Sequence, residues 1–104
     1  MSEKKHPLLK EDQLKVYKSK LNPTWKLIND NQILNLETKV KDFQTALDVV
    51  NQIGKLAEEM DHHPDLHIHN WNNLSINLTS HKAGGLTDQD FILASKIDQL
   101  LKDK

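Results

Sequence analysis

Four of the six histidines of this chain lie between His62 and His69, in the segment MDHHPDLHIHNW that begins at Met60. Histidine titrates closer to neutral pH than any other side chain, and it is a common metal ligand. The cluster therefore indicates a metal site, a proton-transfer site, or histidines spread over a polar surface.

A metal site would require more ligands than the pattern supplies. His67 and His69 alternate on a predicted strand and project from one face, a spacing that can chelate a cation. Two histidines also suit a strand face in contact with water, and the adjacent pair His62–His63 fits no common zinc motif. Because no third ligand follows from the pattern and the chain has no cysteine, we expect no metal.

Proton transfer is the second chemistry that these residues allow. His62 and His63 follow the longest predicted helix, and Pro64 constrains the corner after it. His81 is expected at the end of the last predicted strand, on its polar face. A helix end and a strand end can converge at a sheet edge and form a three-histidine pocket. Residue types alone do not separate this pocket from unrelated surface histidines.

Asp90 has two interpretations that do not exclude each other. The segment TDQD at 87–90 matches a capping box, with Thr87 as the N-cap and Asp90 reaching back. A carboxylate at a helix N-terminus can also face a pocket. Trp25 and Trp71 are typical of a core or an interface, although a flat heteroaromatic ring could stack on either.

Hydrophobic periodicity predicts the elements that carry these residues. Helices are expected from Glu11 to the Asn22–Pro23 pair, from the N-cap Asp42 to the residues before Pro64, and from Thr87 onward. Hairpins are expected with turns at 29–32 and 72–73. The predicted order is α-β-β-α-β-β-α, an α+β fold with a four-stranded antiparallel sheet and helices packed mainly on one face.

Strand alternation assigns faces within the second hairpin. Leu66 and Ile68 are expected on one face, with His67, His69 and Trp71 on the other. Along the following strand the core positions are expected to be Leu74, Ile76 and Leu78, and the outward positions Ser75, Asn77, Thr79 and His81.

Length and composition limit the classes of protein to which this chain can belong. The 104 residues with a net charge of −1 suit a single domain over 1–104, whose residues 1–9 we expect to be a flexible arm. The chain has no basic excess, no run long enough to span a bilayer and no secretory signal. We therefore expect a cytoplasmic protein that binds neither nucleic acid nor membrane.

Helix 43–60 has a wider apolar stripe than one sheet face can cover. A domain of this size gains by burying such a stripe against another copy. We therefore expect a dimer or tetramer joined partly through this helix.

A longer pattern then joins the candidate residues. An acidic residue is followed after three residues by His-His-Pro, after six by an aromatic residue, after nine by histidine, and after eight by aspartate. These are Glu58, His62, His63, Pro64, Trp71, His81 and Asp90. The pattern resembles the signature of the pterin-4a-carbinolamine dehydratases, whose mammalian members double as a dimerisation cofactor of a homeodomain transcription factor.

The resemblance extends from about Leu8 to Leu101. The segments TW at 24–25, KDF at 41–43 and AGGLTDQDFILASKID at 83–98 also look like the family. The segment between Pro64 and Trp71 takes the longer of two usual lengths and adds His67 and His69, which we expect to lie outside the catalytic set.

The resemblance implies dehydration of 4a-hydroxytetrahydropterin to quinonoid dihydropterin, which recycles the pterin cofactor of aromatic amino-acid hydroxylases without a metal or organic cofactor. It implies that His62 and His81 are an acid–base pair and that His63 mainly positions the pterin. Asp90 would hold a histidine or a pterin nitrogen. The expected lining comprises Asp61, Pro64, Thr79, Ser80, Lys82 and Trp25.

Other functions remain open on the same fold. A non-catalytic interaction or coactivator module could bind a partner through the apolar stripe of helix 43–60, and another pterin pathway, such as molybdopterin metabolism, could use the same site. The resemblance also implies an aromatic amino-acid hydroxylase as a partner.

Overall fold

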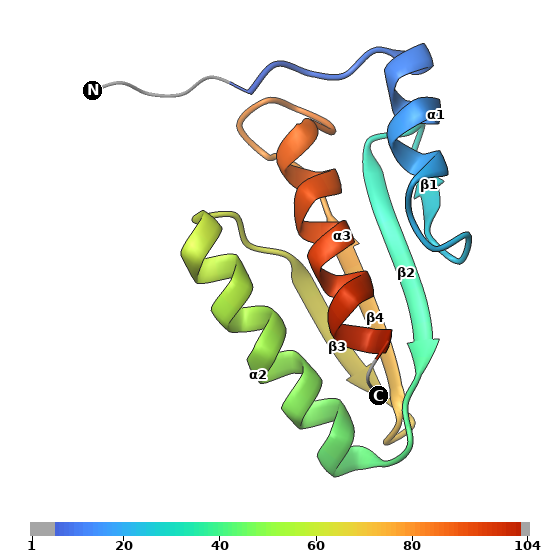
Figure 1. The fold of residues 1–104 in the computed structure, drawn as a ribbon, viewed down its shortest axis with the longest axis vertical. Coiled ribbons are helices and arrows are strands. Elements are labelled where there is room, and N and C mark those ends of the chain that lie inside the picture. The colour runs from blue at the N-terminus through green and yellow to red at the C-terminus, as the bar shows by residue number, and fades with distance from the viewer. Residues whose placement is uncertain (1–5, 103–104) are drawn as a thin grey trace.

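The computed structural model describes residues 6–102 and has the predicted order of elements (Figure 1). The elements are α1 (Glu11–Ser19), β1 (Lys26–Ile28), β2 (Ile33–Lys39), α2 (Phe43–Met60), β3 (Asp65–His69), β4 (Asn73–Leu78) and α3 (Asp88–Lys102). The predicted α-β-β-α-β-β-α order is therefore confirmed. Within the described part of the chain, no helix is both long and apolar enough to cross a membrane.

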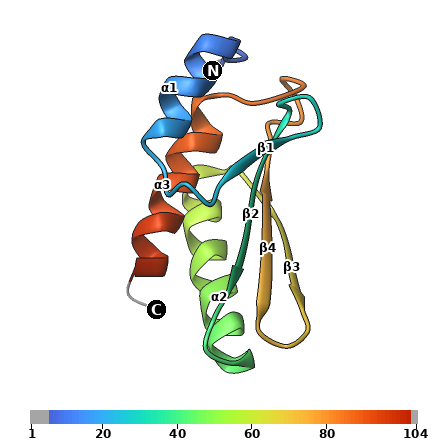
Figure 2. The same ribbon diagram turned by 90° about the vertical axis from the view of Figure 1, so that its right-hand side faces the viewer.

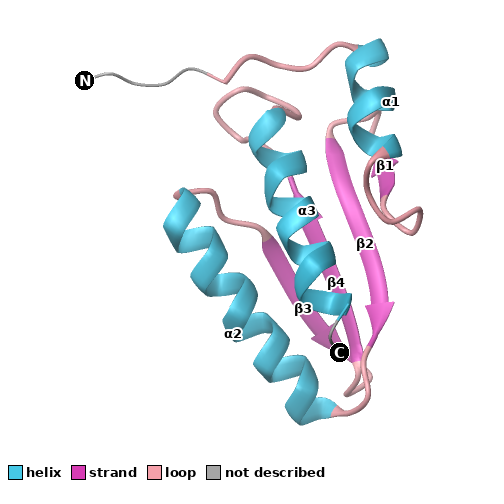
Figure 3. Cartoon of the chain, in the orientation of Figure 1, coloured by secondary structure: helices cyan, strands magenta, loops and turns pink. Residues whose placement is uncertain are grey.

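The four strands form one antiparallel sheet in the order β1-β2-β4-β3. The side view of Figure 2 places the three helices in one layer and the sheet in another, and Figure 3 shows the same division by element type. The predicted packing of helices on one face is confirmed. No helix of residues 6–102 covers the opposite face of the sheet.

The core lies between these two layers, and strand alternation determines which side chains enter it. In β4, Leu74, Ile76 and Leu78 are fully buried, while the residues between them are partly exposed. In β3, Leu66 and Ile68 alternate with the exposed His67 and His69. The predicted faces of the second hairpin are therefore confirmed along both strands.

α2 begins where the sequence predicts. The Asp42 carboxylate accepts hydrogen bonds from the Thr45 hydroxyl at 2.6 Å and the Thr45 backbone N–H at 2.8 Å. These two bonds, the hydroxyl first, lower the pKa of Asp42 from its usual value. The helix buries Ala46, Val49, Ile53 and Ala57. Phe43 and Leu47 of the predicted stripe remain 50% and 37% exposed.

Two local predictions are wrong by a few residues. The turn of the second hairpin comprises 70–72, not 72–73, and both Asn70 and Trp71 have positive φ, at 46° and 56°. Asn72 ties this turn to the chain before α2, because its side-chain amide donates to the Val40 carbonyl at 2.9 Å. β4 ends at Leu78, so His81 lies in a turn and not on a strand.

Residues 6–9, expected to belong to a flexible arm, instead lie against the start of α3 and the loop before it (Figure 1). The Leu9 N–H donates to the Leu86 carbonyl at 2.9 Å, and His6 Nδ1 lies 2.8 Å from Asp88 Oδ1. The rest of the expected arm, residues 1–5, lies outside the described residues.

Candidate functional site

The last turn of α2 directs His62 toward α3. Asp61 adopts the left-handed conformation, with φ 53° and ψ 46°. Its N–H donates to the Glu58 carbonyl at 3.2 Å, and the His62 N–H donates to the Ala57 carbonyl at 3.0 Å. This pair of bonds is a Schellman motif, which reverses the chain direction at a helix end. Pro64 prevents the helix from resuming, because it disfavours helical angles in the residue before it.

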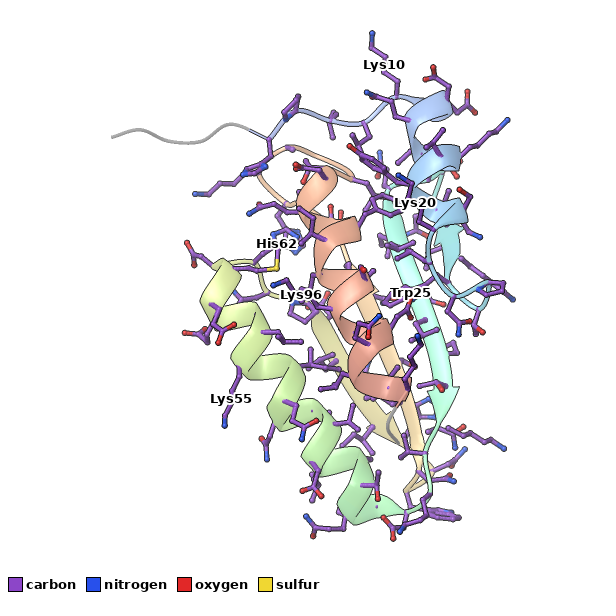
Figure 4. The ribbon with its side chains drawn as sticks, in the orientation of Figure 1. Lys10, Lys20, Trp25, Lys55, His62 and Lys96 are labelled. Carbon is purple, nitrogen blue, oxygen red and sulfur yellow. The ribbon has the colours of Figure 1, made fainter. Side chains whose placement is uncertain are left out.

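His62 contacts a buried carboxylate on α3. Its Nε2 lies 2.6 Å from Asp90 Oδ1; the His62 side chain is 10% exposed and that of Asp90 is 0% exposed. Figure 4 shows His62 between the end of α2 and the start of α3. The prediction that Asp90 holds a histidine agrees with this contact.

The second oxygen of Asp90 is also occupied. Oδ2 accepts the Thr87 backbone N–H at 2.9 Å and the Ser80 hydroxyl at 2.9 Å. The Thr87 hydroxyl lies 2.9 Å from the Ser80 hydroxyl, and it accepts the Gln89 N–H at 3.3 Å. Asp90 reaches back to the Thr87 N–H as predicted, but the Thr87 hydroxyl accepts from Gln89 and the Asp90 N–H donates to the Thr87 carbonyl, so one of the two bonds of the predicted capping box forms. The same carboxylate serves both the cap and the contact with His62.

This network determines which nitrogen of His62 carries a proton. The Thr87 backbone N–H can only donate, and the Ser80 hydroxyl donates to the same carboxylate oxygen, so we infer that Asp90 acts as the acceptor in these contacts. His62 Nε2 then donates, and in the neutral imidazole Nδ1 keeps the lone pair. We infer this tautomer from the hydrogen-bond network. An imidazole oriented in this way can accept a proton at Nδ1 and return it.

His81 lies beside this network on a closed turn. The Ser80 N–H donates to the Gly85 carbonyl at 2.8 Å, and these two residues form an isolated bridge around 81–84. Gly84 has a φ of 82°, a left-handed conformation that glycine adopts without steric cost. His81 and Lys82 are exposed at the tip of the turn. Ser80 therefore joins the His81 turn to Asp90 and, through Asp90, to His62.

His63 points to a different acid from its neighbour. Its Nε2 lies 2.5 Å from Glu58 Oε2, with the two side chains 54% and 77% exposed. Both residues line an open groove of about 620 Å³ that runs along the end of α2. The other lining residues are Asn51, Gly54, Lys55, Ala57, Glu59, Pro64 and Leu66. Neither His62 nor His81 lines this groove, so it does not bring the three histidines together.

Most of the predicted lining residues lie along the chain segments that flank this network. Asp61 is exposed beside His62, and Pro64 is partly exposed in the groove. The Thr79 hydroxyl donates to the Gln32 carbonyl at 2.7 Å, so it is already engaged.

Trp25 does not fit the prediction that it walls the site. Its side chain is fully buried in the core, and its indole N–H donates to Asp98 Oδ1 at 2.8 Å. In Figure 4, α3 lies between Trp25 and His62. The contact with Asp98 explains the burial of this polar aromatic residue and leaves no exposed ring surface.

Trp71 also lies away from the other residues of the pattern. The turn that carries Trp71 connects β3 and β4 and lies near the start of α2 (Figure 1). His62 follows the opposite end of the same helix. The Trp71 side chain is 62% exposed. Regular spacing in the sequence therefore does not bring this aromatic residue to the site within one chain.

His67 and His69 lie on the open face of the sheet with Glu37. His69 Nε2 lies 3.9 Å from Glu37 Oε1, and Ser75 donates to the same carboxylate at 2.5 Å. Among residues 6–102 no group of three or more histidines and acids is arranged to hold a metal ion. The two added histidines are thus separated by the sheet from the helix face where His62 meets Asp90.

Sequence reasoning does not identify the contacts that Glu58 and Thr87 make at the site. Glu58 appears in the spacing pattern, but its partner His63 is five residues away across a helix end, where helical periodicity no longer applies. Thr87 was expected only to cap α3, and its link to Ser80 depends on strand β4 ending beside that cap. The one available signal was the coincidence of the capping box with the spacing pattern.

Comparison with known proteins agrees with the predicted resemblance. The family described as pterin 4 alpha carbinolamine dehydratase matches residues 7–100. A protein of Alkaliphilus metalliredigens (strain QYMF), provisionally named pterin-4-alpha-carbinolamine dehydratase, is 44% identical over 93 residues, covering 89% of this chain and 82% of that protein.

Solved structures show the same fold. A transcriptional coactivator/pterin dehydratase from Brucella melitensis matches with a TM-score of 0.82 and 27% identity, covering 88% of this chain and 96% of that one. A pterin dehydratase-like protein described as a RuBisCO assembly factor in the alpha-carboxysome matches with a TM-score of 0.61 and 17% identity, covering 74% of this chain and 88% of that one. The second match shows likeness of fold alone.

Proposed function

The chain belongs to the pterin-4a-carbinolamine dehydratase family, and from this we propose that it removes water from a 4a-hydroxytetrahydropterin to give the quinonoid dihydropterin. The reaction breaks the bond between C4a and the hydroxyl oxygen and removes the proton from N5. The electron pair of the N5–H bond forms the new double bond between N5 and C4a, and the hydroxyl leaves as water. Two positioned groups are needed, one to donate a proton and one to accept one.

The observation that carries this proposal is the contact of His62 with Asp90. When the buried carboxylate accepts a hydrogen bond from Nε2–H, Nδ1 of the neutral ring is the nitrogen that can exchange a proton with the substrate. His62 is therefore oriented to exchange a proton at Nδ1, and an unrelated surface histidine would have no buried carboxylate as its partner.

His81 is proposed as the other member of the acid–base pair. It lies one residue from Ser80, which donates to the same Asp90 carboxylate, so the turn and His62 share one anchor. We propose that the pterin ring lies along Asp61, Ser80 and Lys82, and that His63 contributes mainly to binding. The Thr79 hydroxyl is occupied by Gln32, so Thr79 would contribute through its backbone.

The test is an assay of purified protein with freshly generated 4a-hydroxytetrahydropterin, following the appearance of the quinonoid product. We expect a rate well above the spontaneous one. The matched blank is the double variant His62→Ala/His81→Ala, purified in the same way. A wild-type rate equal to that of the folded double variant would contradict the proposed activity.

We propose the recycling of the cofactor of aromatic amino-acid hydroxylases as the pathway and the cytoplasm as the location. Assaying the same preparation with a molybdopterin-type substrate tests the alternative pterin pathway. Faster turnover of that substrate would support the alternative pathway and would leave the proposed acid–base roles of His62 and His81 unchanged. Co-purification with a tagged hydroxylase tests the proposed protein partner.

A non-catalytic interaction role is the second candidate, because the first turns of α2 leave two large apolar side chains exposed in the single chain. Phe43 and Leu47 are 50% and 37% exposed there. We propose that a second copy of the chain covers this side, giving a dimer or tetramer. Sedimentation of wild type and Leu47→Glu at micromolar concentration tests this. A 12.0 kDa monomer for wild type would contradict it.

A further inference from the structure

The loop that carries His81 is held firmly at its base and not at its tip. Its inner side is tied to Asp90 through Ser80 and Thr87, as described above, and the bridge between Ser80 and Gly85 closes the turn. Within residues 6–102 the side chains of His81 and Lys82 make no hydrogen bond or ion pair. The position of His81 therefore depends on how the flanks of this loop are held.

The N-terminal segment 6–9 holds the outer flank at three points. Leu9 donates its backbone N–H to the Leu86 carbonyl at 2.9 Å. His6 Nδ1 lies 2.8 Å from Asp88 Oδ1, joining residues 82 positions apart in the chain. Figure 1 shows this segment running over the loop and the first turn of α3.

The third point of contact is Leu8 against Gly85. A Cβ atom at Gly85 would lie 3.0 Å from the Leu8 Cδ2 atom, which is closer than an ordinary carbon–carbon contact. Leu8 is nevertheless 49% exposed, so burial elsewhere does not explain its position. The absence of a side chain at Gly85 allows the segment to approach the turn that ends in the Ser80–Gly85 bridge.

We propose that segment 6–9 positions the His81 turn for the reaction, with His6 and Asp88 as the positioning residues. This inference rests on the proposed function, because it assigns the segment to the placement of a proposed acid–base group. Neither residue touches the substrate. Their contact keeps the outer flank of the loop against α3 while Asp90 keeps the inner flank, so that His81 is held in one position relative to His62.

The expected kinetic effect is modest, because the contact is partly exposed. The His6 and Asp88 side chains are 30% and 42% exposed, and contacts of this kind contribute roughly 0.2–1 kcal/mol. His6→Ala should therefore lower kcat by up to about fivefold. KM should change less, because the substrate contacts proposed for Asp61 and His63 are unaffected.

The experiment combines kinetics with a measurement that needs no activity. Wild type, His6→Ala, Asp88→Asn and the double variant are compared by steady-state dehydration and by the backbone amide NMR signals of His81, Gly84 and Gly85. His6→Asn is the rescue variant, because its side-chain N–H can donate from nearly the position of Nδ1. His69→Ala, on the open sheet face, is the matched control.

We expect both single variants to shift or broaden the three amide signals and to lower kcat, with the double variant no worse than either single one. His6→Asn should recover most of the loss. As an independent check, Gly85→Ala should disturb the same signals in wild type and much less in a Leu8→Ala background, where the added methyl group meets no neighbour.

Unchanged amide signals and unchanged kcat in folded His6→Ala would overturn the proposal. Activity that falls only in proportion to the folded fraction, measured by circular dichroism, would assign His6 to stability and overturn it as well. If wild type itself shows no dehydration, the proposed function fails, and the amide signals still decide whether segment 6–9 holds the turn.

Discussion

His62 and His63 are adjacent in the chain, and each brings Nε2 to a carboxylate, but their surroundings are opposite. His62 meets Asp90, whose side chain is fully buried, at 2.6 Å. His63 meets Glu58, whose side chain is 77% exposed, at 2.5 Å. Similar distances therefore accompany very different degrees of contact with water.

The difference indicates that the distance between a histidine and a carboxylate does not by itself determine how much the pair contributes to stability. An exposed pair is screened by solvent, and holding it in place costs side-chain entropy, so it contributes little. A buried pair lies in a medium of lower effective dielectric constant, where a lost partner leaves an unpaired polar group. Asp90 also accepts bonds from Ser80 and Thr87, whereas Glu58 has one partner within the described residues. The two pairs can be separated by experiment.

The largest expected difference is in turnover. His62→Ala should lower kcat by about 10²–10⁴-fold, the usual contribution of a positioned acid or base. His63→Ala should raise KM more than it lowers kcat, because its proposed work is positioning. Steady-state kinetics of the two folded variants checks this. Equal losses of kcat in both would mean that the buried pair has no special role.

Stability should separate the two acids next. Asp90→Ala leaves the Thr87 N–H and the His62 N–H without an acceptor, while the Ser80 hydroxyl keeps the Thr87 hydroxyl as a partner. The substitution should lower the free energy of unfolding by about 2–4 kcal/mol. Glu58→Ala should change it by less than about 1 kcal/mol. Urea denaturation at neutral pH gives both values. A loss below about 1 kcal/mol for Asp90→Ala would show that water replaces the carboxylate at little cost.

A smaller effect is expected from the histidines on the open face. Changing His67 and His69 together to Asn should lower dehydration by less than about tenfold, which corresponds to less than about 1.4 kcal/mol of barrier. The sheet separates both residues from the pair formed by His62 and Asp90. A larger loss with the fold preserved would place them in the site and remove the distinction between the two faces.

The smallest expected effect concerns pH and Glu37, the acid nearest those histidines. Hydrogen bonds from Asn35 and then Ser75 lower the pKa of Glu37 from its usual value of 4.5, and His69 and His67 add to this. A lowered pKa in the folded protein means that the contribution to stability is present above pH 4.5 and is lost as pH falls through the folded value. Glu37→Gln should therefore lose less stability than wild type on acidification.

Urea denaturation at about pH 6 and about pH 3 measures this difference. Glu59→Gln, which neutralises an exposed carboxylate on α2, is the matched control. If Glu37→Gln and wild type lose the same stability over this interval, the hydrogen bonds to Glu37 do not favour its charged form.

The sequence predicts the fold closely because each element has its own local signal. Asp42 marks a helix start, Pro64 prevents a helix from continuing, and the alternation in β4 identifies the core face. The second turn was misplaced because Asn70, Asn72 and Asn73 are all suitable turn residues. Its position is decided by a distant bond, from Asn72 to Val40, which no local pattern reports.

The site was predictable only in part, for a related reason. The types and spacing of His62, His81 and Asp90 could be recognised, and the contact of His62 with Asp90 follows the expected pairing. The burial of Trp25 and the contact of His6 with Asp88 could not be recognised from the sequence. Both depend on partners more than 70 residues away, Asp98 for Trp25 and Asp88 for His6. Side-chain contacts over such separations are decided by tertiary packing.

The link between His62 and Asp90 also has a consequence for the order of assembly. The two residues are 28 positions apart, and β3, β4 and the His81 turn lie between them. During synthesis the chain can complete α2 and both hairpins before Asp90 has emerged, since domains are made from the N-terminus onward. The contact between His62 and Asp90 then forms only when α3 docks on the sheet. A truncated or stalled chain would therefore contain His62 without its carboxylate, and the arrangement on which the proposed activity depends would arise late, together with the completed core.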